Sequence, residues 1–523
     1  MKKMVLRPVL AGLVCLVFLA ECSGRSGGSG SRQDMENFNP TGLPIVKEME
    51  SFSLLVDDED DPNKKLLPLF EKDTNVRVDV MAYPNNAAVE RKNILLASGD
   101  YPAVISGWLL GQHDIIRLRD DHVIIPLTDL IENYTVNIKE ALELPGVREA
   151  MTHPDGEIYT IPYVVDDPLT KFNPWINTVW LNRLGLPMPT TTEEFKNTLI
   201  AFRDGIPPVN GQRIIPFSAS PYTFRPGVLA GWFGVNASDI FAMIDGRLEI
   251  TIDRPEYREF IKYFADLYAN GLIDPELFTQ DQMTWISKGR MGLYGVSYAY
   301  TPADFASTIT DDITVNQYAY EALPVLRAPG VEKPVYIRAS YGYTVFRTQA
   351  IITDNAKNPL TIIRWFDYLF DQTNSLEMFW GPVGIRFEQL ADGTYRETAN
   401  GRNQEVINQV TPTFFWAMPK FVRPGTKVKP PEGQLPPYNS DDMRDVLYEP
   451  YLDEMIPQSW PETRISQQIT QLTQAIGYYH SQKVAAWISG QANVDAEWDA
   501  YLANLKQLGI DELLSLQRGL IGK

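Results

Sequence analysis

The sequence predicts an α/β protein built from two lobes. A chain of 523 residues is too long to fold around one hydrophobic core, so we expect at least two cores. Apolar residues make up 44% of the chain and aromatic residues 11%, which is typical of a globular protein. Strand-like runs at Phe52–Val56, Val76–Met81 and Pro102–Ile105 are separated by helical patterns at Leu66–Phe70 and Ala88–Ala97. This order predicts right-handed βαβ units on a mostly parallel sheet.

The first 22 residues indicate an export signal. Three basic residues precede the twelve apolar residues Val9–Ala20, which are too few to span a bilayer because about 20 are needed. Leu19-Ala20-Glu21-Cys22 resembles a lipobox, which predicts that Cys22 carries a diacylglyceryl group and becomes the mature N-terminus. Glu21 departs from the small residue usual at its position, so a secreted protein without lipid is the alternative. The Gly/Ser-rich run that follows predicts a flexible tether over residues 23–44.

Charge and cysteine content exclude several classes of function. The formal net charge of −19 argues against binding to nucleic acid and against electrostatic docking on anionic lipid. The two cysteines, Cys15 and Cys22, both lie in the predicted signal, so the folded body has no disulfide and no thiolate nucleophile. The four histidines are scattered without metal-ligand spacing. We therefore expect no cofactor, no metal ion and no nucleic acid partner.

Polar residues follow three predicted strands of the first half. Asp57 and Asp58 follow the first strand, Ser106 and Trp108 follow the third, and Asp166 and Asp167 end the β-rich run Glu157–Val165. Parallel α/β sheets bind ligands beyond the carboxyl ends of their strands, so these residues predict one cleft. The acidic run Asp57–Asp61 also precedes Pro62 and a helix, which favours capping of that helix, with a calcium site as the alternative.

The second half repeats the alternation of strands and helices. A strand at Ile214–Phe217 has Tyr222 beyond its end, and a strand at Met291–Val296 is followed by Tyr298 and Tyr300. The pattern predicts helices at Arg254–Leu267 and Pro359–Phe370, a strand at Tyr341–Phe346, and mostly helix from Ser440 to Leu520. Thr190, Thr191 and Thr192 offer N-caps for a helix that opens at Glu193.

Five stretches in order resemble the large extracellular solute-binding proteins of ABC importers, family 1, of the sugar-binding type. They are ILLASGDYPAVIS at 94–106, the stretch from Gly156 to Asp204, GLIDPELFTQD at 271–281, RWFDYLFDQ at 364–372 and WGPVGIRFE at 380–388. The resemblance implies a two-lobed periplasmic-binding-protein-like (type II) fold, with the ligand cleft between lobes that a three-segment hinge joins. The family often has Glu where Val383 stands, so no role is carried to that position.

The resemblance also implies how the chain divides. Residues 45–165 and 317–380 would form lobe 1, and residues 166–316 and 381–523 would form lobe 2. The three crossings of the hinge would lie near Val164–Asp167, Val315–Pro324 and Gly381–Gly384. The loop after the first strand would face the cleft.

The chemistry of the expected cleft favours sugars. The flat C–H faces of a pyranose stack on indole, and its hydroxyls need carboxylate, amide or guanidinium partners. For any single Trp, burial in a core is the alternative, and an Arg such as Arg386 would suit a uronate. The candidate ligand-binding residues are Asp57, Asp58, Ser106, Trp108, Asp166, Asp167, Tyr222, Tyr298, Tyr300, Trp380 and Arg386.

The function expected from the resemblance is capture of a carbohydrate, in the form of an oligosaccharide, and its delivery to an ABC permease by a monomeric lipoprotein outside the cytoplasmic membrane. The membrane partner would be reached through the lipid anchor on Cys22. A binder of a peptide or another non-sugar solute is one alternative. A secreted polysaccharide-degrading enzyme is the other, but the sequence has no G-x-S-x-G, phosphate-loop or H-E-x-x-H motif to support an enzyme.

Overall fold

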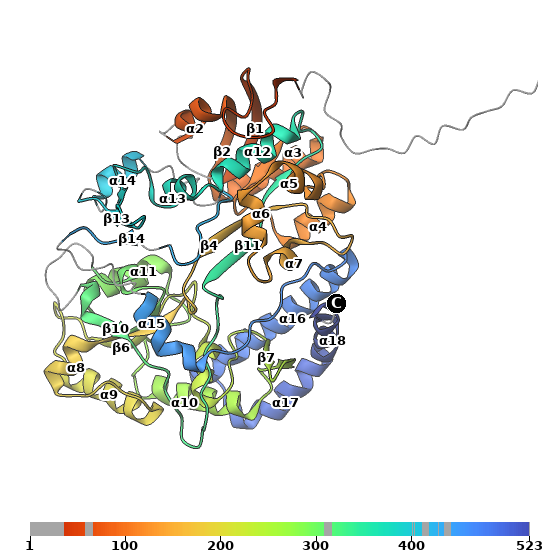
Figure 1. The fold of residues 1–523 in the computed structure, drawn as a ribbon. Helices are drawn as coiled ribbons and strands as arrows, with labels where there is room; N and C mark the ends of the chain where they lie inside the picture. Colours follow the sequence, from red (N-terminus) through yellow and green to blue (C-terminus); the bar gives the residue numbers. More distant parts are fainter. Residues whose placement is uncertain are drawn as a thin grey trace, which may run out of the picture.

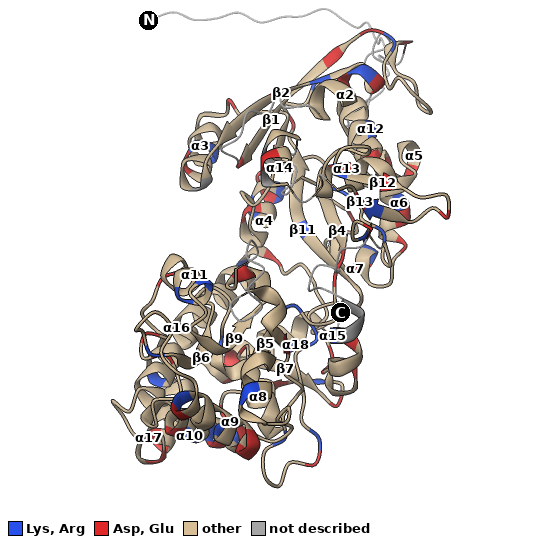
Figure 2. Ribbon diagram, turned by 90° about the vertical axis from the view of Figure 1, so that its left-hand side faces the viewer, with Lys and Arg blue, Asp and Glu red and all other residues tan. Residues whose placement is uncertain are grey.

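Two stacked lobes form the protein, as the two perpendicular views show (Figure 1; Figure 2). The computed structural model describes residues 36–57, 66–307, 316–399, 401, 403–410, 418–426, 428–432 and 441–521. The predicted signal with Cys22, most of the predicted tether, and the acidic residues from Asp58 to Asp61 lie outside the described residues. In the part that is described, no helix combines the length and the apolar character needed to cross a membrane.

Lobe 1 is built on a five-stranded sheet with the strand order β2-β1-β3-β11-β4. β1 (Glu50–Asp57) pairs in parallel with β2 (Val76–Tyr83) and β3 (Val104–Ser106). β11 (Tyr343–Ile352) runs antiparallel to both β3 and β4 (Ile161–Asp166). β1, β3 and β4 therefore point in one direction and end at one edge of the sheet, which confirms the predicted parallel order of the first strands.

Helices cover both faces of this sheet, because neighbouring residues of a strand point to opposite faces. Leu54 of β1 faces a core in which Trp365 and Phe366 are fully buried, whereas Leu55 faces a second core that contains Ile116. The helices of lobe 1 are α2 (Leu66–Thr74), α3 (Asn85–Ser98), α4 (Gln112–Asp120), α5 (Thr128–Tyr134), α6 (Asn137–Leu142), α7 (Val147–Met151), α12 (Pro359–Leu369) and α13 (Gln372–Trp380).

Lobe 2 contains a four-stranded sheet with the order β10-β5-β9-β6. β5 (Asn173–Asn177) is antiparallel to β9 (Tyr294–Ala299) and to β10 (Tyr320–Ala322), and β6 (Ile215–Ala219) is parallel to β9. Phe217 and Val296 face a large core, and Trp175 faces a smaller one in which Trp285 is buried. Thr191 accepts a hydrogen bond from the N–H of Glu194, which confirms a Thr cap at the start of α9.

The remaining elements of lobe 2 surround this sheet (Figure 1). They are α8 (Thr178–Leu184), α9 (Thr192–Gly205), the 3-10 helix η1 (Pro226–Phe233), β7 (Phe241–Ile244), β8 (Arg247–Ile250), α10 (Pro255–Ala269), α11 (Gln282–Arg290), α15 (Asp441–Tyr448), α16 (Thr463–Ile488), α17 (Val494–Gln507) and α18 (Ile510–Ile521). β7 and β8 form a separate antiparallel hairpin.

The segment after α13 packs on lobe 1, which differs from the prediction that residues 381–523 belong to lobe 2. It contains β12 (Phe387–Gln389), β13 (Tyr395–Glu397), α14 (Gln404–Val410) and β14 (Val428–Lys429). Phe387 and Tyr395 share a small core with Tyr163 and Val165 of β4. The N–H of Val164 donates to Lys420 O over 2.9 Å. No crossing therefore occurs at 381–384; that Gly-Pro-rich stretch turns within lobe 1.

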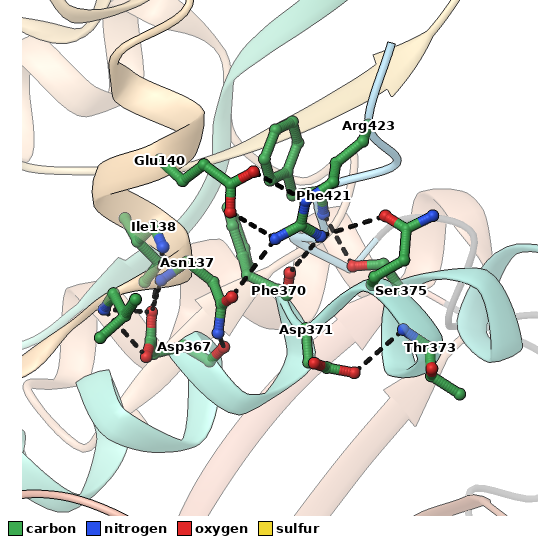
Figure 3. Close-up of polar contacts among 12 residues, drawn as sticks. Asn137, Ile138, Glu140, Asp367, Phe370, Asp371, Thr373, Ser375, Phe421 and Arg423 are labelled. Atoms are coloured by element: carbon green, nitrogen blue, oxygen red, sulfur yellow. Dashed lines mark hydrogen bonds and ion pairs between the residues drawn. The ribbon is translucent and has the colours of Figure 1, made fainter. Parts of the chain in front are cut away.

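A polar network reinforces this docking (Figure 3). The Arg423 guanidinium pairs with Glu140 of α6 and donates to Asn137 Oδ1 over 3.3 Å and to the carbonyl oxygen of Phe370 over 3.4 Å. The carboxylate of Asp367 accepts from the N–H groups of residues 136, 137 and 138 at the start of α6, at 2.8 to 3.1 Å. These contacts connect α6, α12 and the segment that contains Arg423, which are far apart in the sequence.

The other crossings also differ from the prediction. β10 lies in the sheet of lobe 2 and Tyr336 lies in its core, so the chain returns to lobe 1 just before β11 rather than at 315–324. A further excursion follows at residues 452–462. Leu452 packs on lobe 2, Trp460 is buried in lobe 1, and α16 then leads back to lobe 2.

Candidate functional site

Trp108 is an exposed aromatic side chain at the edge of lobe 1 where β1, β3 and β4 end. Gly107, directly after β3, has a φ of +92°, a backbone conformation that glycine adopts without steric cost, and the chain turns sharply there. The turn leaves Trp108 55% exposed. Its backbone N–H donates to Asp57 Oδ1 over 3.1 Å, so the predicted neighbours at the ends of β1 and β3 are in contact.

Trp108 belongs to a cluster of rings at this edge. Its indole meets the ring of Phe346 edge-on, with centroids 5.1 Å apart, and Phe346 stacks on Tyr163 at 5.2 Å. Lys171 Nζ lies 5.3 Å from the centroid of Phe346, and Lys420 Nζ lies 4.0 Å from that of Tyr163. Burial lowers the pKa of Lys420 well below its usual value. Lys420 is also fully buried, so the cluster combines flat apolar faces with one accessible cationic donor, Lys171.

The polar residues at the same edge are held by internal contacts. The Ser106 hydroxyl is fully buried and donates to Gln349 O over 2.8 Å, so it is not available to a ligand. Asp166 Oδ1 accepts from the N–H of Gly425 over 2.7 Å. Asp167 pairs with Lys171 over 2.7 Å and accepts from the Thr344 hydroxyl. The two carboxylates therefore hold the segment that leaves lobe 1 after β4 and the loop at Gly425 beside it.

Lobe 2 faces this edge with Tyr300, the residue directly after β9. The ring of Tyr300 packs on Phe172 at 5.8 Å, and Arg444 of α15 lies 5.4 Å from its centroid. Tyr300 is close enough to Tyr163 of lobe 1 to act on it electrostatically. Burial is the main cause that raises the pKa of Tyr163, with smaller contributions from Asp167 and Tyr300. The two lobes therefore approach each other beside the ring cluster.

Three other predicted site residues are engaged in contacts within one lobe: Tyr298 in lobe 2, and Trp380 and Arg386 in lobe 1. Tyr298 is only 3% exposed and packs on Phe172 and Phe224 inside lobe 2, so the prediction that it contacts a ligand is not supported by its position. Trp380 packs on the neighbouring ring of Phe387 in lobe 1.

Arg386 donates to the carbonyl oxygens of Trp380 and Gly401. Those bonds hold the turn after α13, so this guanidinium is engaged within the chain. Tyr222, in contrast, is 82% exposed beyond the end of β6.

Several members of the ring cluster were missed from the sequence. Phe346 comes from β11, which enters the sheet between β3 and β4 from a distant part of the chain. Lys171 lies four residues after Asp167, and this opposite-charge spacing is a signal that was available. Tyr163 lies within the predicted strand, where its side chain had no reason to be singled out.

The excursion at residues 452–462, which we call the strap, links the lobes on one side. Asp453 accepts from Asn236 Nδ2 of lobe 2 over 2.6 Å and from the N–H of Arg338 over 2.7 Å. At the other end, Trp460 stacks on His153 of lobe 1 with centroids 4.1 Å apart, and Arg347 lies 4.6 Å from its ring. Both ends of the strap are therefore anchored by side chains.

Within the described ranges, no group of three or more His, Cys, Asp or Glu side chains is placed to hold a metal ion. The edge offers rings, carboxylates and the Lys171 ammonium group, which suit hydrogen bonding to a polyol and stacking on its C–H faces.

Comparison with known proteins identifies the family. The model of the bacterial extracellular solute-binding proteins matches residues 46–372, which is more than half of the chain. The fructooligosaccharide ABC transporter substrate-binding protein FusA of Streptococcus pneumoniae is 28% identical over 532 residues, covering 96% of this chain and 95% of that protein. The polygalacturonan/rhamnogalacturonan-binding protein YtcQ of Bacillus subtilis is 20% identical, covering 67% of this chain and 69% of YtcQ.

Solved structures agree with this assignment. FusA in complex with kestose superposes with a TM-score of 0.75 at 27% identity, covering 90% of this chain and 98% of that one. An HMO-binding solute-binding protein of Bifidobacterium longum infantis gives a TM-score of 0.75 at 22% identity, covering 90% of this chain and 98% of that chain, and supports the fold alone. The chain therefore belongs to the bacterial extracellular solute-binding protein family.

Proposed function

We propose that this protein is the carbohydrate-binding component of an ABC importer and that its ligand is an oligosaccharide. The observation that carries the proposal is the half-exposed indole of Trp108, which stands beside carboxylate and ammonium groups at the edge where the lobes meet. An indole face offers a sugar ring an apolar surface, and the charged groups offer its hydroxyls partners. FusA, which shares the fold and 28% of aligned residues, is named for fructooligosaccharides.

Capture works by closure of the lobes around the ligand. The crossing after β4 carries Asp167 and Lys171, and Tyr300 of lobe 2 lies near Tyr163 of lobe 1. A ligand that touches groups of both lobes binds the closed form more tightly than the open form, so it shifts the population toward closure. The permease would recognise that closed form.

Attachment to the membrane follows from the N-terminal sequence. We infer that Cys22 is lipidated and that the Gly/Ser-rich run after it tethers a monomeric body to the outer face of the cytoplasmic membrane. Mass spectrometry of the exported protein tests this, since a diacylglyceryl-modified Cys22 at the mature N-terminus supports it and an unmodified signal-cleaved chain overturns it.

A thermal-shift screen of residues 32–523 tests the ligand class. The panel holds neutral oligosaccharides that include kestose, uronate oligosaccharides, monosaccharides and peptides. A ligand at 100 times its Kd stabilises the fold by about 2.7 kcal/mol, which is a readable shift. We expect a saturable shift with one oligosaccharide class and no released product. A shift with peptides only would overturn the carbohydrate assignment, and released product would replace transport by hydrolysis.

A further inference from the structure

A pocket of about 430 Å³ lies in lobe 2 between the loop after β6 and helix α16. It is separate from the ring cluster around Trp108, since its lining comes from residues 220–227, 237–240, 277–278 and 473–484, together with Ile252 and Tyr257. Its volume falls in the range of about 300–1,000 Å³ found for small-molecule sites. Lobe 2 therefore offers a concave surface of its own.

One wall of the pocket starts at the edge of lobe 2 that carries Tyr300. β6 and β9 run parallel, with Ala219 paired to Tyr298, so the end of β6 lies on the same edge as Tyr300. The loop that follows β6 forms one wall of the pocket. The opposite wall is α16, whose first residue Thr463 hydrogen-bonds Asp120 of α4 in lobe 1. The loop wall thus begins at the interlobe edge, and the helix that forms the other wall contacts lobe 1 at its first residue.

A run of rings connects the pocket to that edge. Phe224 lines the pocket and packs on Tyr298 at 5.1 Å. Tyr298 packs on Phe172 at 6.3 Å, and Phe172 packs on Tyr300 at 5.8 Å. Tyr300 in turn lies near enough to Tyr163 of lobe 1 to contribute to the raised pKa of that residue. Ring contacts inside lobe 2 therefore link the pocket wall to Tyr300.

The lining has the chemistry of a site for a neutral polyol. Phe224 and Phe278 supply apolar ring surface, and hydroxyls come from Ser220, Ser238, Thr473 and Ser481. One guanidinium, Arg225, and one carboxylate, Asp239, also line the pocket, so its charges balance. A uronate or a charged peptide would find no excess of the opposite charge there.

Gly477 leaves the helical wall of the pocket bare. A Cβ built on it meets no atom within 4 Å, so the space beside α16 at this point is open. Its neighbour Tyr478 is 68% exposed, and Tyr222, beside Pro221 of the opposite wall, is 82% exposed. These two exposed rings, each next in sequence to a residue that lines the pocket, are suited to stack on sugar units that continue out of it.

We propose that this pocket holds a terminal sugar unit of a neutral oligosaccharide, whose next units run along the interlobe edge toward Trp108. The inference rests on the proposed carbohydrate-binding function and adds to it where the chain end sits. It gives Tyr222 a place at the site and makes the pocket the element that fixes one end of the ligand.

Filling the pocket tests the proposal. Gly477→Leu places a side chain in the open space, and Ala475→Leu adds the same side chain at an exposed position of the same helix as the matched control. Isothermal titration uses kestose and other neutral trisaccharides. We expect Gly477→Leu to raise the Kd of the bound trisaccharide at least tenfold and Ala475→Leu to leave it within twofold, with both variants melting no lower than the parent.

The outcomes separate the pocket from the function. A parent that binds a trisaccharide and a Gly477→Leu variant that binds it equally well overturn the pocket but keep the proposed function. A parent that binds no carbohydrate overturns both. Should Gly477→Leu not fold, hydrogen exchange of the parent decides, because bound trisaccharide must slow exchange in residues 473–481, and unchanged exchange there contradicts the proposal.

Discussion

Truncation of Trp108 should weaken ligand binding without unfolding lobe 1. The exposed 55% of a Trp surface of about 250 Å² is roughly 140 Å². A sugar face that covers half of it removes about 70 Å² from water, which contributes about 1.8 kcal/mol at ~25 cal/mol per Å². Trp108→Ala should therefore raise the Kd roughly 20-fold. The rest of the indole, roughly 110 Å², is buried and includes the edge-on contact with Phe346, so the unfolding free energy should also fall by about 2–3 kcal/mol.

Titration calorimetry and urea denaturation measure the two effects separately. Trp108→Phe is the control, because it keeps an aromatic face and should recover most of the affinity. A Kd of Trp108→Ala within twofold of the parent would refute the reasoning that places the ligand on this indole. A decrease in unfolding free energy well beyond the expected value would show that the indole mainly supports the fold.

Three further changes probe the framework around the site. Arg423→Ala should lower the unfolding free energy by about 1–3 kcal/mol, because it removes hydrogen bonds to part-buried acceptors, whereas Arg77→Ala at an exposed ion pair should cost under about 0.5 kcal/mol in urea denaturation. Trp460→Ala should lower the unfolding free energy by about 3–5 kcal/mol in the same assay, since the ring is 4% exposed. A urea denaturation curve equal to that of the parent would contradict the claim that Trp460 anchors the strap. Burial lowers the pKa of His153 and of His480 to about 4, so between pH 6.5 and 4 the unfolded chain binds protons that the native chain does not. The unfolding free energy should therefore decrease as the pH is lowered from 6.5 to 4. His153→Gln should flatten the slope of unfolding free energy against pH, and an unchanged slope would refute this.

The sequence pattern predicted the first sheet and part of the site. The apolar runs that contain Phe52 and Val76 form parallel neighbouring strands in the structure. The rule that ligands bind beyond strand ends correctly predicted that Asp57 and Trp108 lie close together. Such local patterns are visible because a buried strand needs a continuous run of apolar residues. The turn at Gly107, which exposes Trp108, also depends on a local signal.

The predictions were wrong where they depended on the exact end of a strand or on pairing with a distant part of the chain. The strand expected to stop at Val296 extends to Ala299, so Tyr298 lies within it and points into the core rather than beyond its end. Phe346 was missed because antiparallel β11 inserts between β3 and β4, a pairing that no local pattern encodes. The Gly-Pro-rich stretch at Gly381 marks a turn, and sequence does not tell a turn within a lobe from a crossing between lobes.

Calorimetric titration of residues 32–523 with a panel of oligosaccharides, followed by chromatography of the ligand, tests the central claim most directly. We predict saturable one-to-one binding of one oligosaccharide class and recovery of the sugar intact. Binding confined to peptides, or recovery of shortened sugar, would contradict the account of this chain as the carbohydrate-binding component of an importer.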